Sequence, residues 1–278
     1  MKKEGYIYAI LATAAMGSLG VFVNYTTVNP FTLTFLRLFI PAILLTVFFI
    51  AKGVKFEKIT LPTISAGIFL SLTIIFYIFS IRKTTMSLSV FLLYLGPAIA
   101  ALFAFVLLKE PLTKSDFLSL VLAMIGLLLI LRFKIELKMI GNSLSGILSG
   151  ISYGLLIVAN RAAKQTNTQL SSLYQFAVGS LFVFPLFILS NPDLNKIESE
   201  FITILSMAII CGLLGITFMI AAIKRLRAIE YGVLAYLEIL FAVVFGFIFF
   251  KDTPDFYKLT GGALIVAGGF VQTLKSRR

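Results

Sequence analysis

The sequence predicts an all-α integral membrane protein with ten transmembrane helices arranged as two inverted five-helix repeats. The chain has 278 residues, 59% of them hydrophobic, and only 13% are charged, about half the share of a typical soluble domain. The mean hydropathy is +1.03. Ten apolar runs of about 20 residues each match the length that a hydrocarbon layer of ~30 Å requires. The third observation is an internal repeat.

The internal repeat relates residues 84–128 to residues 226–270, at an offset of 142 positions. Aromatic, basic, acidic and glycine positions recur in register, and the clearest pairs are Tyr94 and Tyr236, Lys109 and Lys251, Glu110 and Asp252, and Gly126 and Gly268. We interpret the match as a duplication. It predicts one five-helix unit at residues 1–134 and a second at residues 135–278.

The first unit contains five predicted helices, at residues 6–23, 30–51, 62–81, 86–108 and 115–131. The first run is too long for a signal-peptide core and lacks a small-residue cleavage site. Pro30 opens the second run, and a basic loop follows it. A Gly96-Pro97 pair lies inside the fourth run, where we expect a structural hinge.

The second unit contains five more predicted helices, at residues 141–161, 169–190, 201–223, 229–250 and 256–274, with an acidic loop at 191–200. Because five is an odd number, the second copy must enter the membrane from the opposite side. The duplication is therefore predicted to be an inverted repeat, an arrangement that underlies many secondary transporters.

Basic residues orient the chain in the membrane. If the N-terminus is cytoplasmic, the cytoplasmic segments hold about twice as many Lys and Arg as the outer segments. We therefore expect a multi-pass protein of the cell membrane with both termini in the cytoplasm. The net charge of +12 is spread over short loops, which is typical of such loops and does not indicate a nucleic-acid partner.

The two most specific stretches are LGPAIAALFAFVLLKEPL at 95–112 and LEILFAVVFGFIFFKDTP at 237–254. With the ten runs, they resemble the drug/metabolite transporter superfamily, EamA-type branch, over essentially the whole chain. The first copy keeps Pro97 and Glu110. The second has Glu238-Ile239 where the family usually has Glu-Pro, and Asp252 where it has Glu. The resemblance implies export or exchange of small metabolites.

Polar residues at membrane depth define the candidate site. Glu238 is expected near mid-depth, where a carboxylate is costly unless it faces the protein interior. It is either a substrate-amine ligand and proton-coupling acid or a hydrogen-bonded strut between helices. Tyr231 lies two turns earlier on the same face, and Ser89 and Gly96 occupy the matching positions of the first copy.

Four further residues have two candidate roles, contact with the substrate and packing between helices. Arg37 is expected to snorkel to the outer surface, to form a structural pair, or to contact a substrate anion. Tyr153, Tyr77 and Asn160 are candidate substrate ligands or helix-packing residues.

Tyr94 and Tyr236 repeat in register and are therefore interpreted as structural. Small residues that would let helices approach closely are Gly17, Gly20, Gly150 and Gly154.

The composition also separates function classes. The chain has no histidine, Glu238 is the one mid-membrane acid, and Cys211 has no base partner, so an enzyme is not expected, nor a metal or cofactor. A channel or lipid scramblase remains an alternative, although no charged or carbonyl-rich filter segment is evident. The sequence favours an amino acid or amine over a sugar phosphate or other anion, with a proton as the candidate coupling ion. Lys224 and Arg225 argue for an anion. We expect a monomer or a weak homodimer.

Overall fold

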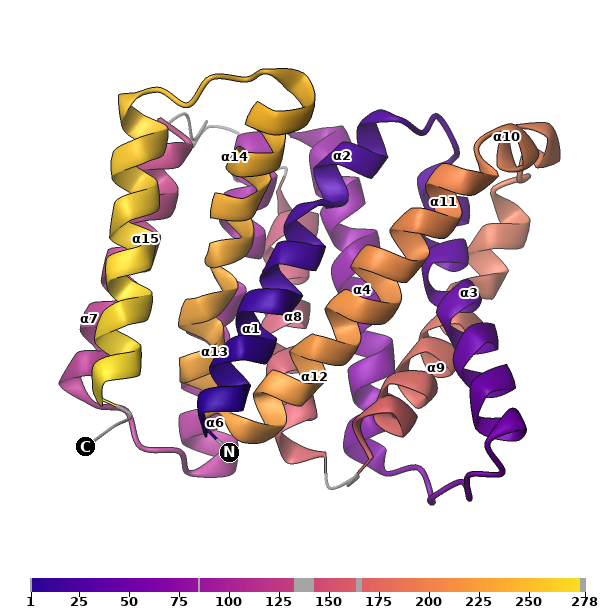
Figure 1. The fold of residues 1–278 in the computed structure, drawn as a ribbon, viewed down its shortest axis with the longest axis horizontal. Helices are drawn as coiled ribbons and strands as arrows, with labels where there is room; N and C mark the ends of the chain where they lie inside the picture. Colours follow the sequence, from indigo (N-terminus) through magenta and orange to yellow (C-terminus); the bar gives the residue numbers. More distant parts are fainter. Residues whose placement is uncertain (1, 85, 133–142, 164–166, 276–278) are drawn as a thin grey trace.

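The computed structural model describes residues 2–84, 86–132, 143–163 and 167–275. All regular structure in these residues is helical (Figure 1). The helices of the first half are α1 (Lys2–Gly17), α2 (Leu19–Asn24), α3 (Pro30–Ala51), α4 (Leu61–Lys83), α5 (Met86–Leu93), α6 (Gly96–Leu108) and α7 (Lys114–Ile130). Those of the second half are α8 (Leu144–Ala162), α9 (Thr168–Leu189), α10 (Leu194–Ser199), α11 (Phe201–Met207), a π-helix η2 (Ala208–Leu214), α12 (Gly215–Arg225), α13 (Ala228–Ala235), α14 (Leu237–Phe250) and α15 (Phe256–Lys275).

Eight helical stretches in the described residues are long and apolar enough to cross a membrane. They are Lys2–Asn24, Pro30–Ala51, Leu61–Ile81, Leu88–Leu108, Leu144–Ala162, Thr168–Leu189, Phe201–Arg225 and Ala228–Phe250. The two remaining predicted spans correspond to α7, which has 17 residues, and α15. The predicted helix start near Gly141 and the boundary between the two predicted units lie outside the described residues.

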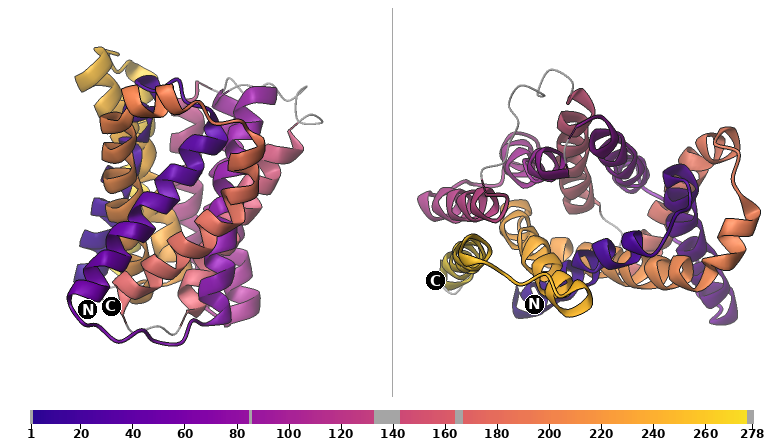
Figure 2. Two further views of the ribbon diagram at one scale, coloured as in Figure 1. Left: turned by 90° about the vertical axis from the view of Figure 1, so that its right-hand side faces the viewer. Right: turned by 90° about the horizontal axis from the view of Figure 1, so that it is seen from above.

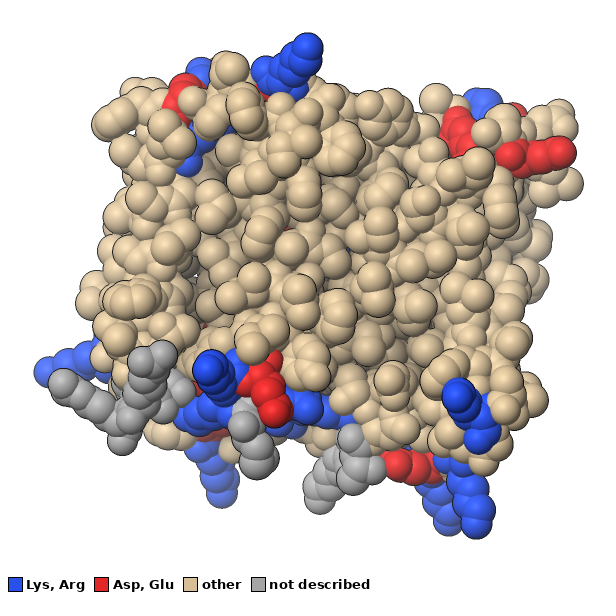
Figure 3. Space-filling view, in the orientation of Figure 1, with Lys and Arg blue, Asp and Glu red and all other residues tan. Residues whose placement is uncertain are grey.

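Charged side chains gather at two opposite ends of the molecule, and a wide uncharged band separates them (Figure 3). Large apolar side chains such as Leu181 and Val47 are exposed along this band. An exposed apolar band of this kind is costly in water and suits a hydrocarbon layer. The start of α1 and the end of α15 lie at the same end of the molecule (Figure 1).

Two predicted helices are broken at the same position of the repeat. The run 86–108 is split between α5 and α6 at Tyr94-Leu95, and the run 229–250 is split between α13 and α14 at Tyr236. Pro97 accounts for the first break because it lacks a backbone N–H. The second break forms without proline: the N–H of Ile239 bonds the carbonyl of Tyr236 at 3.1 Å.

Two more predicted helices are irregular. The run 6–23 is interrupted at Ser18, between α1 and α2. The run 201–223 widens into η2, where residues bond in the looser π pattern; such π segments often lie at functional sites.

The helices α7 and α15 pack side by side, apart from the main group of helices (Figure 2, right). A Cβ at Gly126 would lie 2.5 Å from the Gly261 carbonyl oxygen, and a Cβ at Gly268 would lie 2.7 Å from that of Ser119. The glycines thus permit an antiparallel contact at close range. Ser119 and Gly261 are 142 positions apart, as are Gly126 and Gly268, so the two contacts exchange under the repeat.

The other main contacts also join the two halves. The helix α4 packs on α8, and α12 packs on α1. Close approach depends on small residues: a Cβ at Gly150 would lie 2.3 Å from the Leu92 carbonyl oxygen, at Gly154 2.9 Å from that of Gly96, and at Gly17 2.7 Å from that of Glu238. The expectation for Gly20 is wrong, because nothing lies within 4 Å of a Cβ there.

Candidate functional site

Glu238 lies in the first turn of α14, directly after the break at Tyr236. A carboxylate is favoured there because the N-terminus of a helix carries partial positive charge. The side chain is half-buried, and Tyr94, at the break of the first copy, is its hydrogen-bonding partner. The two breaks therefore place a carboxylate and a phenol together in the interior of the protein.

Three more tyrosines lie within electrostatic reach of the Glu238 carboxylate: Tyr77 of α4, Tyr153 of α8 and Tyr231 of α13. The hydroxyls of Tyr153 and Tyr231 are buried, and neither has a partner at hydrogen-bond distance among the described residues. The two hydroxyls are oriented toward each other as a weak pair, which places two phenol groups beside the carboxylate.

Arg37 faces the same carboxylate from α3. The side chain is only 8% exposed, and its Nη2 donates to the carbonyl of Cys211 at 3.3 Å. That carbonyl belongs to η2. Arg37 therefore turns inward as a structural pair with η2 instead of snorkelling outward, and it also supplies the positive charge opposite Glu238.

Two predicted ligands lie elsewhere. Ser89 Oγ is 2.7 Å from Ser80 Oγ, where it joins α5 to the end of α4. Asn160 exchanges amide hydrogen bonds with Gln175 of α9, the shorter at 2.8 Å. Both are completely buried, so in this arrangement they fasten helices and do not face Glu238.

Gly96 and Pro97, the predicted hinge, begin α6 at the break. A Cβ at Gly96 would lie 2.8 Å from Cδ1 of Tyr153, so glycine lets the Tyr153 ring approach the backbone. Beyond the expected residues, the structure adds Tyr94 to the site. Its aromatic ring lies 5.6 Å from that of Tyr236, whose hydroxyl donates to the Tyr94 carbonyl at 2.7 Å.

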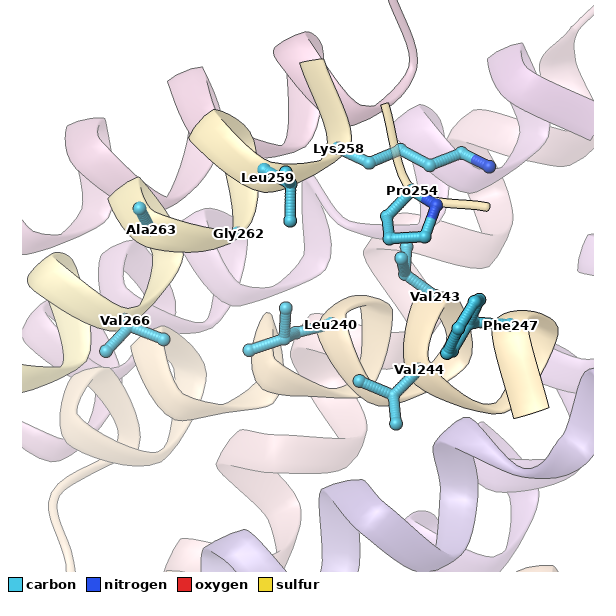
Figure 4. Close-up of a pocket in the computed structure, with 10 residues that line it drawn as sticks. All are labelled: Leu240, Val243, Val244, Phe247, Pro254, Lys258, Leu259, Gly262, Ala263 and Val266. Carbon is cyan, nitrogen blue, oxygen red and sulfur yellow. The ribbon is translucent and has the colours of Figure 1, made fainter. Parts of the chain in front are cut away.

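A separate groove of about 280 Å³ lies between α14 and α15 (Figure 4). Its lining is aliphatic and aromatic, apart from Lys258 at one end. The Lys258 ammonium is engaged with Asp252 at 2.7 Å. The groove offers no convergent polar groups. In this it differs from the cluster of Glu238, Arg37, Tyr77, Tyr94, Tyr153 and Tyr231, which we call the Glu238 group. The described residues contain no group of three or more His, Cys, Asp or Glu side chains that could hold a metal ion.

Comparisons with known proteins relate this architecture to transporters. The profile of the EamA-like transporter family matches the chain twice, at residues 3–132 and 141–274. An uncharacterized transporter of Archaeoglobus fulgidus is 27% identical over 96% of this chain and 95% of its own length. The pseudopaline exporter CntI of Pseudomonas aeruginosa is 23% identical over 95% of this chain and 94% of its own length. A solved crystal structure, 20% identical, covers all of both chains with a TM-score of 0.88.

Proposed function

The chain belongs to the EamA-like transporter family, and from that premise we propose that it is a secondary transporter for a small metabolite that works by alternating access. The observation that carries this proposal is the Glu238 group. A half-buried carboxylate, four tyrosines and one guanidinium meet where two broken helices face each other. Breaks of this kind free backbone groups for a solute, and in many transporters they form the binding site.

We propose ten membrane spans in two inverted repeats, at residues 1–134 and 135–278. The antiparallel contact of α7 with α15 supports it, since Gly126–Gly261 and Ser119–Gly268 exchange at the 142-residue offset. The two separate family matches support it as well. Under this proposal α7 and α15 are the fifth helices of the two copies, and two like halves of opposite direction can exchange conformations to alternate access.

The Glu238 group favours a solute with an ammonium group, such as an amino acid or an amine. Phenol hydroxyls and one carboxylate bind cationic donors well, whereas a phosphate requires cationic or backbone donors. Arg37 is partly committed to the Cys211 carbonyl, which weakens the case for a sugar phosphate. Export is the proposed direction, and the name of the Pseudomonas aeruginosa relative, an exporter, supports it.

A proton is the proposed coupling ion. A carboxylate at this depth must be neutralised as the protein alternates, either by the solute's ammonium or by a proton. Glu238 is the proposed carrier of that proton, and Arg37 and Tyr94 are the charged and hydrogen-bonding groups that interact with its carboxylate.

The proposed topology places both termini in the cytoplasm. A single cysteine at Thr27, in a Cys211→Ser background, should react with a membrane-impermeant maleimide on intact cells, and a cysteine at Lys55 should not. The reverse labelling pattern would invert the orientation and leave the repeat proposal standing.

Substrate class is tested by an uptake panel in proteoliposomes, with amino acids, amines and phosphorylated sugars side by side. We expect saturable uptake and counterflow for a member of the first two classes. Transport of phosphate esters alone would overturn the proposed substrate class. Conductance without counterflow would overturn the transporter mechanism in favour of a channel.

A further inference from the structure

A second cavity, of about 630 Å³, lies between α1, α9, α12 and the loop before α4. It is separate from the Glu238 group, with which it shares no lining residue. Under the proposed topology it opens toward the cytoplasm. We propose that this vestibule binds a zwitterionic solute, with at least one carboxylate and one ammonium group, before the solute reaches Glu238. The inference rests on the proposed function for its role in loading.

One wall of the vestibule is cationic. Arg225 lies 4.9 Å from the ring centroid of Tyr8, and its Nε donates to Glu4 at 3.2 Å. The Glu4 side chain is 58% exposed, so the pair is weak and screened by salt. Glu4 shows how a carboxylate sits on this guanidinium, and a solute carboxylate can replace it.

An unpaired cation lies beside this wall. The Lys224 ammonium is buried and has no hydrogen-bond partner among the described residues. It lies within electrostatic reach of Glu57, which lines the vestibule. Lys224 itself is not among the lining residues, so it adds positive potential behind Arg225 and leaves the direct contact with an anionic group to Arg225.

The opposite wall carries the negative charge. Glu57 is exposed on the loop before α4, and the Tyr174 hydroxyl of α9 donates to its backbone carbonyl. That bond fixes the loop against α9 and so holds Glu57 at the lining of the vestibule. It is the group that would bind the solute's ammonium.

The floor between the two walls is aromatic. Tyr8 and Phe218 stack with ring centroids 6.0 Å apart, and the neighbouring Thr217 hydroxyl is buried with no hydrogen-bond partner in the described part of the chain. Cavities of about 300–1,000 Å³ hold drug-sized ligands. The vestibule therefore has room for a solute larger than a single amino acid, with a charged group at each end.

Calorimetric titration of the full chain in nanodiscs at fixed ionic strength tests this proposal. Three probes are compared. The dipeptide Lys-Glu carries both ammonium and carboxylate groups, spermidine carries only cationic groups, and tricarballylate carries only anionic groups. We expect the dipeptide to bind at least about tenfold more tightly than either other probe, since only it pairs with both walls. Equal affinity for all three, or no dipeptide binding at millimolar concentration, would overturn the vestibule.

Variants locate the binding. Arg225→Gln and Glu57→Gln should each weaken dipeptide binding about tenfold. Arg225→Lys keeps the charge and should retain most of the binding. The control Lys52→Gln removes an exposed cation at the same end of the molecule and should leave dipeptide binding unchanged. Unchanged binding in both charge-removal variants would contradict the proposal. Glu238→Gln should keep dipeptide binding. Loss of dipeptide binding in Glu238→Gln would assign the binding to the Glu238 group and leave the proposed function intact. Dipeptide binding by the unmodified protein without counterflow of any solute would refute the proposed function alone.

Discussion

The turn after α6 and the turn after α14 lie at opposite ends of the molecule (Figure 1). Both turns have the same backbone conformation. Lys109 and Lys251 both adopt a left-handed conformation with φ of 55°. The residue after each donates its N–H to the carbonyl six positions earlier, Glu110 to Ala104 and Asp252 to Gly246, at 3.2 Å in both. Under the proposed duplication, this turn is preserved at the level of individual hydrogen bonds.

The side chains of the two turns have different partners. Glu110 is 12% exposed and accepts from Arg161 of α8 at 2.6 Å and from the N–H of Ala228 at 2.9 Å. Asp252 is 61% exposed and pairs with Lys258 at 2.7 Å. The first turn thus holds elements of the other half, whereas the partner found for Asp252 among the described residues lies within its own half.

The next carboxylate along the chain strengthens the contrast. Asp116 of α7 is 1% exposed and accepts from Arg227 at 2.8 Å and from Gln272 of α15 at 2.8 Å. Its counterpart in the repeat is Lys258. Among the charged pairs of the described residues, the buried ones lie at the end bearing the start of α1, while those at the other end are more exposed and contribute little. Separating the helices at the end bearing the start of α1 therefore costs more free energy than separating them at the other end.

The largest expected effect is at Asp116. Asp116→Ala removes the shared acceptor of Arg227 and Gln272, while Arg227 keeps Glu230 at 3.2 Å, so we expect a loss of about 2–3 kcal/mol in the free energy of unfolding. The matched control Asp252→Ala should lose less than about 1 kcal/mol because that pair is largely exposed. Thermal unfolding of both variants in detergent measures the difference, and equal losses would remove the contrast between the two ends.

The shared backbone predicts a medium effect of equal size at both ends. Lys109→Gly and Lys251→Gly should each raise the free energy of unfolding by about 1 kcal/mol, because glycine adopts the left-handed conformation without the steric cost of a Cβ. Both lysine side chains are exposed. The same unfolding assay applies, and a gain at one turn alone would show that the turns are not equivalent.

The smallest expected effect concerns Glu200, just before α11. Hydrogen bonds from Thr26, then Thr27, hold the pKa of this carboxyl below its ordinary value of 4.5. A lowered folded-state pKa means that the stabilisation is present above about pH 4.5 and is lost as pH falls through the lowered value. Glu200→Gln should flatten the acid limb of a stability-versus-pH curve slightly, and an unchanged limb would contradict the assignment.

The apolar runs were sufficient to locate the helices, because length and hydropathy alone determine which segments avoid water. The run 30–51, for example, matches α3 at both ends. Proline marked one break, at Pro97. The equivalent break at Tyr236 carries no proline or glycine, so it follows from packing against the other half and could not be read from local sequence.

The candidate site was predictable only in part. Glu238 and Tyr153 were expected from their depth, Tyr231 from the helix face that it shares with Glu238, and Tyr77 as a polar residue within a span; the structure places the three tyrosines within electrostatic reach of Glu238. Ser89 and Asn160 were selected on the same grounds but bond neighbouring helices. Depth in the membrane is encoded along the chain, whereas the direction of a side chain depends on which helix packs beside it. Tyr94 was interpreted as structural because it recurs in register as Tyr236, and the packing of the two halves places it beside Glu238.

Proton-driven accumulation and exchange, compared in Glu238→Gln proteoliposomes, test the role of Glu238 most directly. Glutamine keeps the shape and hydrogen bonding of the side chain but cannot carry the charge. With the solute identified by the uptake panel, we predict that Glu238→Gln inserts normally, loses pH-driven accumulation and retains counterflow. Accumulation at the normal rate with the normal pH dependence would contradict the coupling role and assign Glu238 to the scaffold.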